Sequence, residues 1–275
     1  MIFLDVAFVI RRDCPRCASI VRRILDIVPA DWNLIFENEV ARFIGKKGVP
    51  LDSVKADIIV TIGGDGTVLR TLQRAHGPVL GINMGGLGFL SEVELGMVEN
   101  TIYKLERKEY RIEKSIKLKV TLNGVRQMDC TNEVLIHSDR IAKIRRFGIY
   151  TSDNFIDLVA ADGVIVATPV GSTSYSFSAG GPIIYPTLDA AVITYLAPFI
   201  SGSRSIVIPP DQEINIRILG KDQDCTLVLD GQENVKVSQA DDIRVSLSEN
   251  KAEFVNVGRT FFERMRDKLI KNVVD

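Results

Sequence analysis

Apolar residues in the N-terminal third of the chain occur both in continuous runs and in stretches with helical spacing. The continuous runs, which predict strands, cover residues 3–10, 32–36, 56–62 and 78–83. The helical spacings, which predict helices, cover residues 18–28, 67–76 and 96–106. Strands that alternate with helices build a mostly parallel sheet with both faces covered. We therefore predict a Rossmann-like α/β domain over residues 1–107.

From Tyr110 onward the pattern changes to short strands. Residues 116–122 alternate strictly, and Asn123-Gly124 predicts a hairpin whose second strand runs to Ile136. Further strand-like runs cover residues 141–150, 155–159, 164–167, 206–208, 214–219, 226–229, 235–237, 243–247 and 253–257. These runs predict an all-β, sandwich-like domain over residues 108–257.

The last segment, residues 258–275, contains an amphipathic pattern over residues 260–273. This pattern predicts a closing helix that returns to the first domain. Its apolar face is expected to carry Phe261, Phe262, Met265 and Leu269.

Composition narrows the class of protein. The chain has 275 residues, of which 46% are hydrophobic and 25% charged, with a net charge of -1. This composition supports a packed core and gives no basic surface for nucleic acid. The start lacks a basic n-region, and the longest uncharged stretch, residues 163–188, is rich in Gly, Ser, Thr and Pro. We expect a cytoplasmic protein with neither a nucleic-acid nor a membrane partner.

Four cysteines occur, and two of them form the motif Cys14-Pro15-Arg16-Cys17. This motif follows a predicted strand and resembles a redox-active dithiol. A structural zinc site needs a second pair, whereas Cys130 and Cys225 are isolated in the sequence. Two reduced thiols near a helix start are the default interpretation, and a regulatory disulfide is the alternative.

The strand at residues 56–62 runs into Gly63-Gly64-Asp65-Gly66-Thr67, and a helical pattern follows at once. Glycines allow the backbone to approach a ligand closely, and amides at a helix start attract phosphate. A carboxylate repels phosphate, so Asp65 has a different role, such as orienting a hydroxyl or binding a metal ion. The alternative is an ordinary turn in which Asp65 caps the helix.

Three further stretches are candidates for binding. A second glycine cluster, residues 81–90, contains Gly86-x-Gly88 but lacks the third glycine of the dinucleotide fingerprint. Residues 171–178 are dense in small hydroxyl side chains, which suit sugar hydroxyls and amides. Asn132-Glu133 lies beside apolar residues, and either binds a ligand or faces solvent at a strand end. Asp230-Gly231 is explained by a hairpin turn.

Taken together, these stretches resemble the NAD kinase family over most of the chain and in the family's order. The matching motifs are Gly63-Gly64-Asp65-Gly66-Thr67, residues 81–90, Asn132-Glu133, residues 162–182, Asp230-Gly231-Gln232 and Phe261-Phe262. Diacylglycerol kinases, sphingosine kinases and phosphofructokinases resemble the first motif too, whereas its combination with residues 171–175 is specific. Two positions depart from the family pattern: Gly86, where members often have a basic residue, and Phe199, where many have His.

The resemblance implies transfer of the γ-phosphoryl group of ATP, or of polyphosphate, to the 2′-hydroxyl of the adenosine ribose of NAD, giving NADP. Asp65 would orient or deprotonate that hydroxyl. The residues that would bind phosphate and ATP are Gly63, Gly64, Gly66 and Thr67. The residues that would bind NAD are Asn132, Glu133, Asp162, Thr173, Ser174, Tyr175, Ser178, Ala197 and Gln232. Mg²⁺, or another divalent cation, would arrive with ATP, no protein residue is assigned as a metal ligand, and the family forms homodimers or homotetramers.

Two other functions are compatible with part of the pattern. A lipid or sugar kinase would share the turn at residues 63–67 but has no use for the hydroxyl-rich residues 171–178. A non-catalytic NAD(P)-binding regulator would keep Asn132 and those hydroxyls but has no use for Asp65. The presence of both features favours the NAD kinase interpretation.

Overall fold

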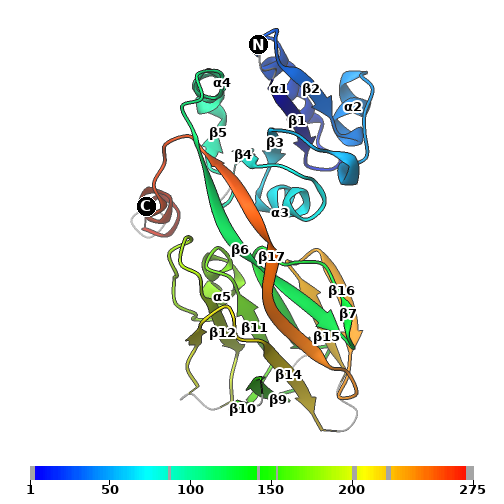
Figure 1. Cartoon of the computed structure of the whole chain (residues 1–275), viewed down its shortest axis with the longest axis vertical. Helices are drawn as coiled ribbons and strands as arrows, with labels where there is room; N and C mark the ends of the chain where they lie inside the picture. The colour runs from blue at the N-terminus through cyan, green and yellow to red at the C-terminus, as the bar shows by residue number, and fades with distance from the viewer. Residues whose placement is uncertain are drawn as a thin grey trace. The chain divides into compact units, whose positions relative to one another are not determined.

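The computed structural model describes residues 4–85, 88–140, 143–152, 154–199, 203–220 and 224–270. The chain forms two compact units, and each is described by itself (Figure 1). The first unit consists of Met1–Lys114 and Glu253–Asp275, and the second consists of Ser115–Ala252. Two strands, β6 (Arg111–Leu122) and β17 (Ile243–Asn256), each contribute residues to both units.

The first unit contains a parallel sheet with the strand order β2-β1-β3-β4. Its strands are β1 (Asp5–Ile10), β2 (Asn33–Phe36), β3 (Ile58–Gly63), β4 (Val79–Asn83) and β5 (Val93–Glu94). Its helices are α1 (Pro15–Leu25), α2 (Asn38–Ile44), α3 (Asp65–Arg74), α4 (Val98–Glu106) and α6 (Phe261–Met265). Shorter turns are η1 (Leu51–Ser53), η2 (Leu95–Met97) and the π-helical η4 (Arg266–Ile270). The strand order reverses between β1 and β3, and open α/β sheets bind ligands beyond the carboxyl ends of strands at such a reversal.

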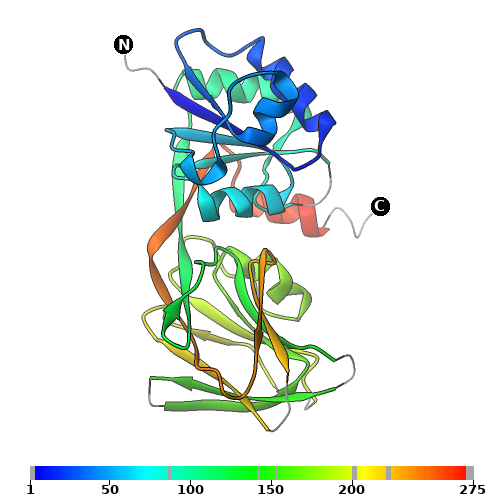
Figure 2. The same ribbon diagram turned by 90° about the vertical axis from the view of Figure 1, so that its right-hand side faces the viewer.

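Both faces of this sheet are buried, which explains why β3 lacks polar alternation. On one face, Phe8, Val60 and Ile62 share a core cluster with Val21 of α1 and Leu105 of α4. Helix α3 lies on the opposite face, as Figure 2 shows. The predicted α/β layer is confirmed.

The second unit is a sandwich of two sheets. One sheet has the order β10-β9-β14-β17, with β6 beside β17, and the other has the order β13-β12-β11-β8-β15-β16. Their strands include β7 (Val125–Arg126), β8 (Glu133–Ser138), β9 (Arg145–Thr151), β10 (Asn154–Ala161), β11 (Gly163–Ala167), β12 (Ala191–Leu196), β13 (Ile206–Ile208), β14 (Ile214–Leu219), β15 (Cys225–Leu229) and β16 (Glu233–Val237). A short helix, α5 (Tyr175–Ser178), follows the turn η3 (Gly171–Thr173). Apolar side chains of both sheets form one buried cluster, so the predicted sandwich-like domain is confirmed.

The structure differs from the sequence prediction in several strands. The Asn123-Gly124 turn is present, with positive φ at both residues, but its second strand β7 ends at Arg126. Residues 133–138 instead form β8 in the other sheet. The two runs at 243–247 and 253–257 are parts of the single strand β17. Helix α2 was missed because its seven residues cover only about two turns. Strand β12 was missed because a short apolar run does not by itself distinguish a strand from a buried helical segment.

The closing helix is shorter than predicted. Helix α6 ends at Met265 and continues as the π-helical turn η4 to Ile270, while residues 271–273 of the prediction lie outside the described part of the chain. Phe261 is buried, but Phe262 is 63% exposed. The expectation that both phenylalanines lie on the apolar face is therefore wrong for Phe262, since adjacent positions on a helix point about 100° apart.

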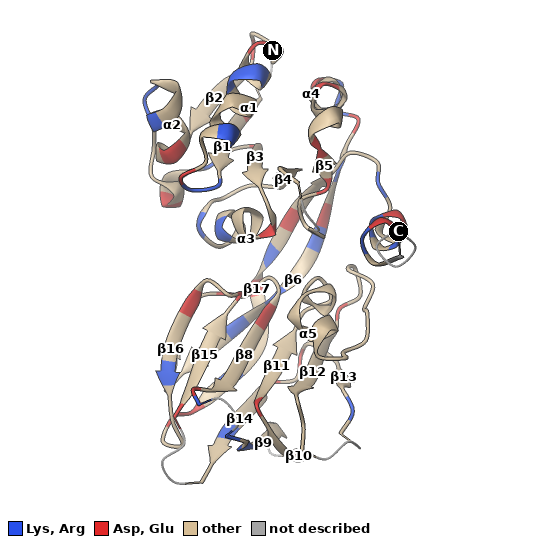
Figure 3. Ribbon diagram, turned by 180° about the vertical axis from the view of Figure 1, so that it is seen from behind, with Lys and Arg blue, Asp and Glu red and all other residues tan. Residues whose placement is uncertain are grey.

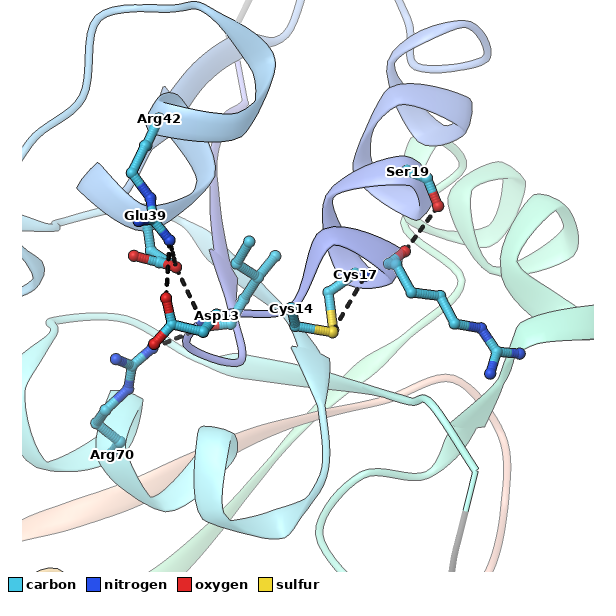
Figure 4. Close-up of a disulfide and its surroundings, with 9 residues drawn as sticks. Asp13, Cys14, Cys17, Ser19, Glu39, Arg42 and Arg70 are labelled. Carbon is cyan, nitrogen blue, oxygen red and sulfur yellow. Dashed lines mark hydrogen bonds and ion pairs between the residues drawn. A yellow bond between two sulfur atoms is a disulfide. The ribbon is translucent and has the colours of Figure 1, made fainter.

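Cys14 and Cys17 form a disulfide at the start of α1 (Figure 4), so the default prediction of two reduced thiols is wrong. The helix begins at Pro15, with Cys14 as its N-cap, and this turn brings the two Cα atoms to 5.3 Å. Cys14 is half-buried and Cys17 is buried. The other two cysteines, Cys130 and Cys225, are free and buried in the second unit.

Within the described residues, no helix has both the length and the apolar character required to cross a membrane.

Candidate functional site

Asp65 is the first residue of α3, directly after the carboxyl end of β3. The N-cap of α3 is Gly64, and it makes no side-chain capping bond. The alternative interpretation of Asp65 as a helix cap is therefore wrong. Its carboxylate instead accepts hydrogen bonds from residues 24 to 26 positions later in the chain.

The loop before β5 surrounds the Asp65 carboxylate. Oδ2 accepts a hydrogen bond from the amide of Phe89 at 2.6 Å, and Oδ1 accepts from the amide of Leu90 at 3.2 Å. Oδ1 also accepts from the amide and the hydroxyl of Ser91, at 2.9 and 2.8 Å. A Cβ atom at Gly88 would collide with both Asp65 and Ser91, so a glycine is required for this close approach. The second glycine cluster thus serves to orient the carboxylate of the first, while its residues 86–87 lie outside the described part of the chain.

The remaining residues of the first motif differ in their surroundings. A Cβ atom at Gly63 would collide with Oγ1 of Thr67, which is buried. A Cβ atom at Gly64 would meet no heavy atom within 4 Å, and Gly66 is exposed. Gly63 and Thr67 therefore pack against each other within the turn, while Gly64 has open space at its Cβ position and Gly66 is exposed.

In the second unit, Asp230 organises the segment that contains Asn132 and Glu133. Its carboxylate accepts hydrogen bonds from the amides of Thr131 and Asn132, both at 2.7 Å, and of Glu133, at 3.0 Å. The side chain is buried, at 4% exposure. The sequence explained Asp230 as a hairpin residue, and its φ of 49° agrees, but the turn also places a carboxylate against three amides of a distant segment.

The turn after β11 packs on the other side of the same segment. Oγ1 of Thr168 donates to the carbonyl of Thr131 at 2.6 Å, and the amide of Thr168 donates to the carbonyl of Asn132 at 2.9 Å. A Cβ atom at Gly171 would collide with the backbone of Asn132. The backbone of Asn132 is thus fixed from both sides.

Oγ1 of Thr131 is buried without a hydrogen-bond partner among the described residues, and so is one acceptor atom of each of the next two residues, Oδ1 of Asn132 and Oε2 of Glu133. The two residues are 7% and 8% exposed, respectively. Buried polar atoms are normally paired, so unpaired acceptors at a fixed backbone indicate a place for ligand donors such as hydroxyls or an amine.

Burial raises the pKa of the Glu133 carboxyl to about 7, and the neighbouring Asp230 carboxylate acts in the same direction. Hydrogen bonding from the Ser174 hydroxyl and the Tyr175 amide opposes this rise. Glu133 therefore exchanges a proton close to neutral pH, and a bound hydroxyl donor favours its ionised form.

The hydroxyl-rich residues 171–178 divide into two groups. Ser172 accepts from the amide of Ile184 at 2.9 Å, and Ser176 bonds to Thr194 at 2.9 Å, so these two buried hydroxyls hold the turn together. The four predicted ligand residues are less buried: Thr173 and Ser174 are half-buried, while Tyr175 and Ser178 are exposed. Helix α5 and strands β11 and β12 carry no charged residue, as Figure 3 shows.

Not every predicted NAD-binding residue lies at this end of the sandwich. Gln232 is exposed in the β15–β16 turn, two positions after Asp230, and therefore belongs to the same end. Asp162 and Ala197 lie together at the opposite end of β11, where the amide of Asp162 donates to the carbonyl of Leu196 at 2.9 Å. Glu133 pairs with Ala167 at the end of β11, five steps from Asp162, so the two groups are about 16 Å apart along the strand.

Sequence reasoning missed three contributions. It did not identify Ser91 as a partner of Asp65, Asp230 as the acceptor for residues 131–133, or Lys268 near the Asp65 loop. In residues 88–91 and 230–232 a glycine lies close to a polar residue, which could have drawn attention to them. No sequence period, however, links these segments to Asp65 or to residues 131–133, which they contact. In the described part of the chain, no group of three or more His, Cys, Asp or Glu side chains is arranged to hold a metal ion.

Comparison with known proteins agrees with this arrangement. The family model described as ATP-NAD kinase N-terminal domain matches residues 32–110, and the ATP-NAD kinase C-terminal domain matches residues 131–257. The NAD kinase of Thermoplasma acidophilum is 52% identical over 272 residues, which cover 99% of this chain and 100% of that protein. The NAD kinase of Methanosarcina mazei is 37% identical over 267 residues, covering 94% of this chain and 91% of that protein.

Two solved structures share the fold. An NAD kinase from Archaeoglobus fulgidus in complex with ATP has a TM-score of 0.74 and 27% identity, covering 98% of this chain and 99% of that one. Yeast NADH kinase complexed with NADH has a TM-score of 0.86 and 23% identity, covering 98% of this chain and 88% of that one, and supports the fold alone.

The fold, the family matches and the glycine-bounded carboxylate define a nucleotide-dependent phosphotransferase. The chain belongs to the NAD kinase family.

Proposed function

We propose that this NAD kinase transfers the γ-phosphoryl group of ATP, supplied as its Mg²⁺ complex, to the 2′-hydroxyl of the adenosine ribose of NAD. The observation that carries the proposal is the fixed carboxylate of Asp65 at the start of α3. A carboxylate held by three amides and one hydroxyl keeps a single orientation, and phosphoryl transfer depends mainly on positioning.

The hydrogen bonds of Asp65 favour Oδ2 as the atom that acts in the proposed reaction. Among the described residues, Oδ1 accepts three hydrogen bonds and Oδ2 accepts one. Oδ2 therefore carries fewer hydrogen bonds than Oδ1 and is the oxygen with acceptor capacity left. In the proposed reaction Oδ2 accepts the hydrogen bond of the ribose 2′-hydroxyl and takes its proton as the hydroxyl oxygen attacks the γ-phosphorus. The bond from the γ-phosphorus to the β-γ bridging oxygen breaks, and ADP leaves with that oxygen.

The open space at Gly64 and Gly66 accommodates the phosphates of ATP, because the amides of a helix start attract negative charge. NAD is held in the second unit by Asn132 and Glu133, whose unpaired Oδ1 and Oε2 atoms accept hydrogen bonds from ribose hydroxyls or the adenine amine. Thr173, Ser174, Tyr175, Ser178 and Gln232 add donors and acceptors at the same end of the sandwich.

The test is formation of NADP from NAD and MgATP, followed with an NADP-specific dehydrogenase. Asp65→Asn is compared with the parent and with Asp31→Asn, which changes an exposed carboxylate of the same unit. We expect the Asp65 variant to lose at least about a hundredfold in kcat, and the Asp31 variant to match the parent. Equal activity of the Asp65 variant would refute its role, and NAD binding by a parent that forms no NADP would favour the non-catalytic regulator. Polyphosphate and NADH, tested in parallel, define the donor and acceptor range.

We also propose that the enzyme is a cytoplasmic homodimer or homotetramer. The family resemblance supports assembly. Contact of Asp162 and Ala197 with a ligand held by a second copy would explain why these two residues lie at the end of β11 away from Asn132 and Glu133. Light scattering on the purified protein measures the mass directly. A monomer that retains full activity would contradict this assignment.

A further inference from the structure

The C-terminal segment carries a lysine to the loop that holds Asp65. The ammonium of Lys268, in η4, lies 5.2 Å from the centre of the Phe89 ring. The amide of Phe89 donates to Oδ2 of Asp65 at 2.6 Å. One residue of the loop therefore contacts both the carboxylate and the lysine, and all of these residues belong to the first unit.

Several contacts fix the segment that carries Lys268. Thr260 and Glu263 form a capping box that defines the start of α6. Arg264 forms an ion pair with Glu92 at 2.5 Å, and both of these side chains are largely buried. Glu92 directly follows Ser91, a partner of Asp65, so the C-terminal segment is anchored next to the loop.

Two other cations of this segment form ion pairs with carboxylates other than Asp65. Arg259 pairs with Asp267, and Arg264 pairs with Glu92 and, at 3.4 Å, with Glu113. The charge of Lys268 interacts with Asp65 and Glu92 and is opposed by Arg259 and Arg264. Burial lowers the pKa of Lys268 to about 8, and the Asp65 carboxylate limits that fall.

A carboxylate at a phosphate site repels the incoming phosphoryl group, and the sequence contains neither a Walker A lysine nor a protein-kinase lysine motif. A partly desolvated ammonium whose charge interacts with that carboxylate opposes the repulsion, because charge interactions strengthen away from water. The ammonium of Lys268 in the C-terminal segment is such a group, although its position matches no known phosphate-binding motif.

We propose that Lys268 is a further catalytic residue that binds the transferred phosphoryl group beside Asp65. The inference rests on the proposed function. As the 2′-oxygen bonds to the γ-phosphorus and the bond to ADP breaks, the 2′-hydroxyl proton passes to Oδ2 of Asp65. Lys268 gives up no proton and stabilises the charge on the phosphoryl oxygens.

The test compares Lys268→Met, which keeps the apolar stem over Phe89, with Lys268→Arg, which keeps the charge. Arg266→Met is the matched control, since it removes a cation from an exposed position of the same turn. We expect Lys268→Met to lower kcat/KM for ATP by about 10²–10³-fold and to weaken tripolyphosphate binding in calorimetry, with the Kd for NAD unchanged. Arg266→Met should match the parent in all three measurements.

The pH profile separates a charge role from a packing role. Activity of the parent requires protonated Lys268, so kcat/KM for ATP should fall as pH rises through about 8. Lys268→Arg should retain activity and lose this alkaline limb, because arginine stays protonated to about pH 12. An unchanged limb in Lys268→Arg, or Lys268→Met activity and tripolyphosphate binding within twofold of the parent, would overturn the inference.

Failure of the proposed function gives a different result. A parent that forms no NADP refutes the reaction, while the tripolyphosphate measurement still tests Lys268 independently. In that case, a loss of tripolyphosphate affinity in Lys268→Met that Arg266→Met does not show supports Lys268 as a phosphate ligand. Equal affinity of the parent and Lys268→Met overturns it.

Discussion

Asp65 accepts two hydrogen bonds from Ser91, one from its amide at 2.9 Å and one from its hydroxyl at 2.8 Å. The two residues are 26 positions apart and follow different strands of the same sheet. Their contact converts two separate glycine-rich loops into one rigid support for a carboxylate. Substitutions that disturb this support, or the support that Asp230 gives to Asn132, should change kcat, KM or the free energy of unfolding by measurable amounts.

Gly88→Ala should damage the Asp65 support without changing any charge. The added Cβ atom would collide with Oδ1 of Asp65 and with the Ser91 hydroxyl, so the carboxylate must shift. We expect kcat to fall by about a hundredfold, because displacement of a reacting group by about 1 Å has effects of that size. Gly96→Ala is the control, since its Cβ atom would meet nothing within 4 Å. Similar kcat values for the two variants would contradict the assigned role of the loop.

Asp230→Asn should weaken both folding and NAD binding. The amide group preserves the shape and tolerates the positive φ, but its NH₂ faces a backbone donor where a carboxylate oxygen now accepts. We expect the free energy of unfolding to fall by about 2–3 kcal/mol and the KM for NAD to rise. Chemical denaturation and steady-state kinetics measure the two effects. Asp211→Asn, at an exposed position of the same unit, should change neither, and an unaltered Asp230 variant would show that the three amide contacts are dispensable.

Glu133 should make stability depend on pH near neutrality. Its pKa rises from the ordinary value of 4.5 to about 7 in the folded protein, because burial disfavours the ionised form. The folded state therefore holds a proton that the unfolded state has lost, and stability decreases as pH rises from about 4.5 to 7. Glu133→Gln should flatten that decrease in denaturant unfolding across pH 5 to 8. Glu233→Gln, an exposed change in the same unit, should retain it, and a slope shared by all three proteins would refute the assignment.

The cysteines should divide into two pairs with different reactivity. Cys14 and Cys17 are joined, while Cys130 and Cys225 are free and buried. Under native conditions without reductant, a maleimide should label none of the four. Denaturation alone should expose two reactive thiols, and denaturation with reductant should expose all four. Four labels without reductant, counted by mass spectrometry, would show that the disulfide is absent.

Local patterns predicted most of the fold for a physical reason. The buried strand β3 and the amphipathic helix α1 each bury apolar side chains at the regular spacing of their secondary structure. That spacing is short-range, so it can be seen directly in the sequence. The sequence misjudged β17 because a long strand with a polar middle appears as two, and it misjudged Phe262 because a doublet of aromatic residues does not show which ring is buried. Both errors concern what a segment packs against.

Local sequence patterns were sufficient to predict the α/β and sandwich layers, the family and the position of Asp65 after a buried strand. The folded structure was needed to show that Ser91 supports Asp65 and that Asp230 supports Asn132, 98 positions away. It was also needed to show that Lys268 lies over Phe89. These contacts depend on how distant segments meet once apolar burial has brought the strands together. A hydrogen bond or ring contact between such segments leaves no period in the chain. Asp65 and Asn132 could therefore be named from sequence motifs, whereas the contacts that Ser91, Asp230 and Lys268 make with distant segments could not.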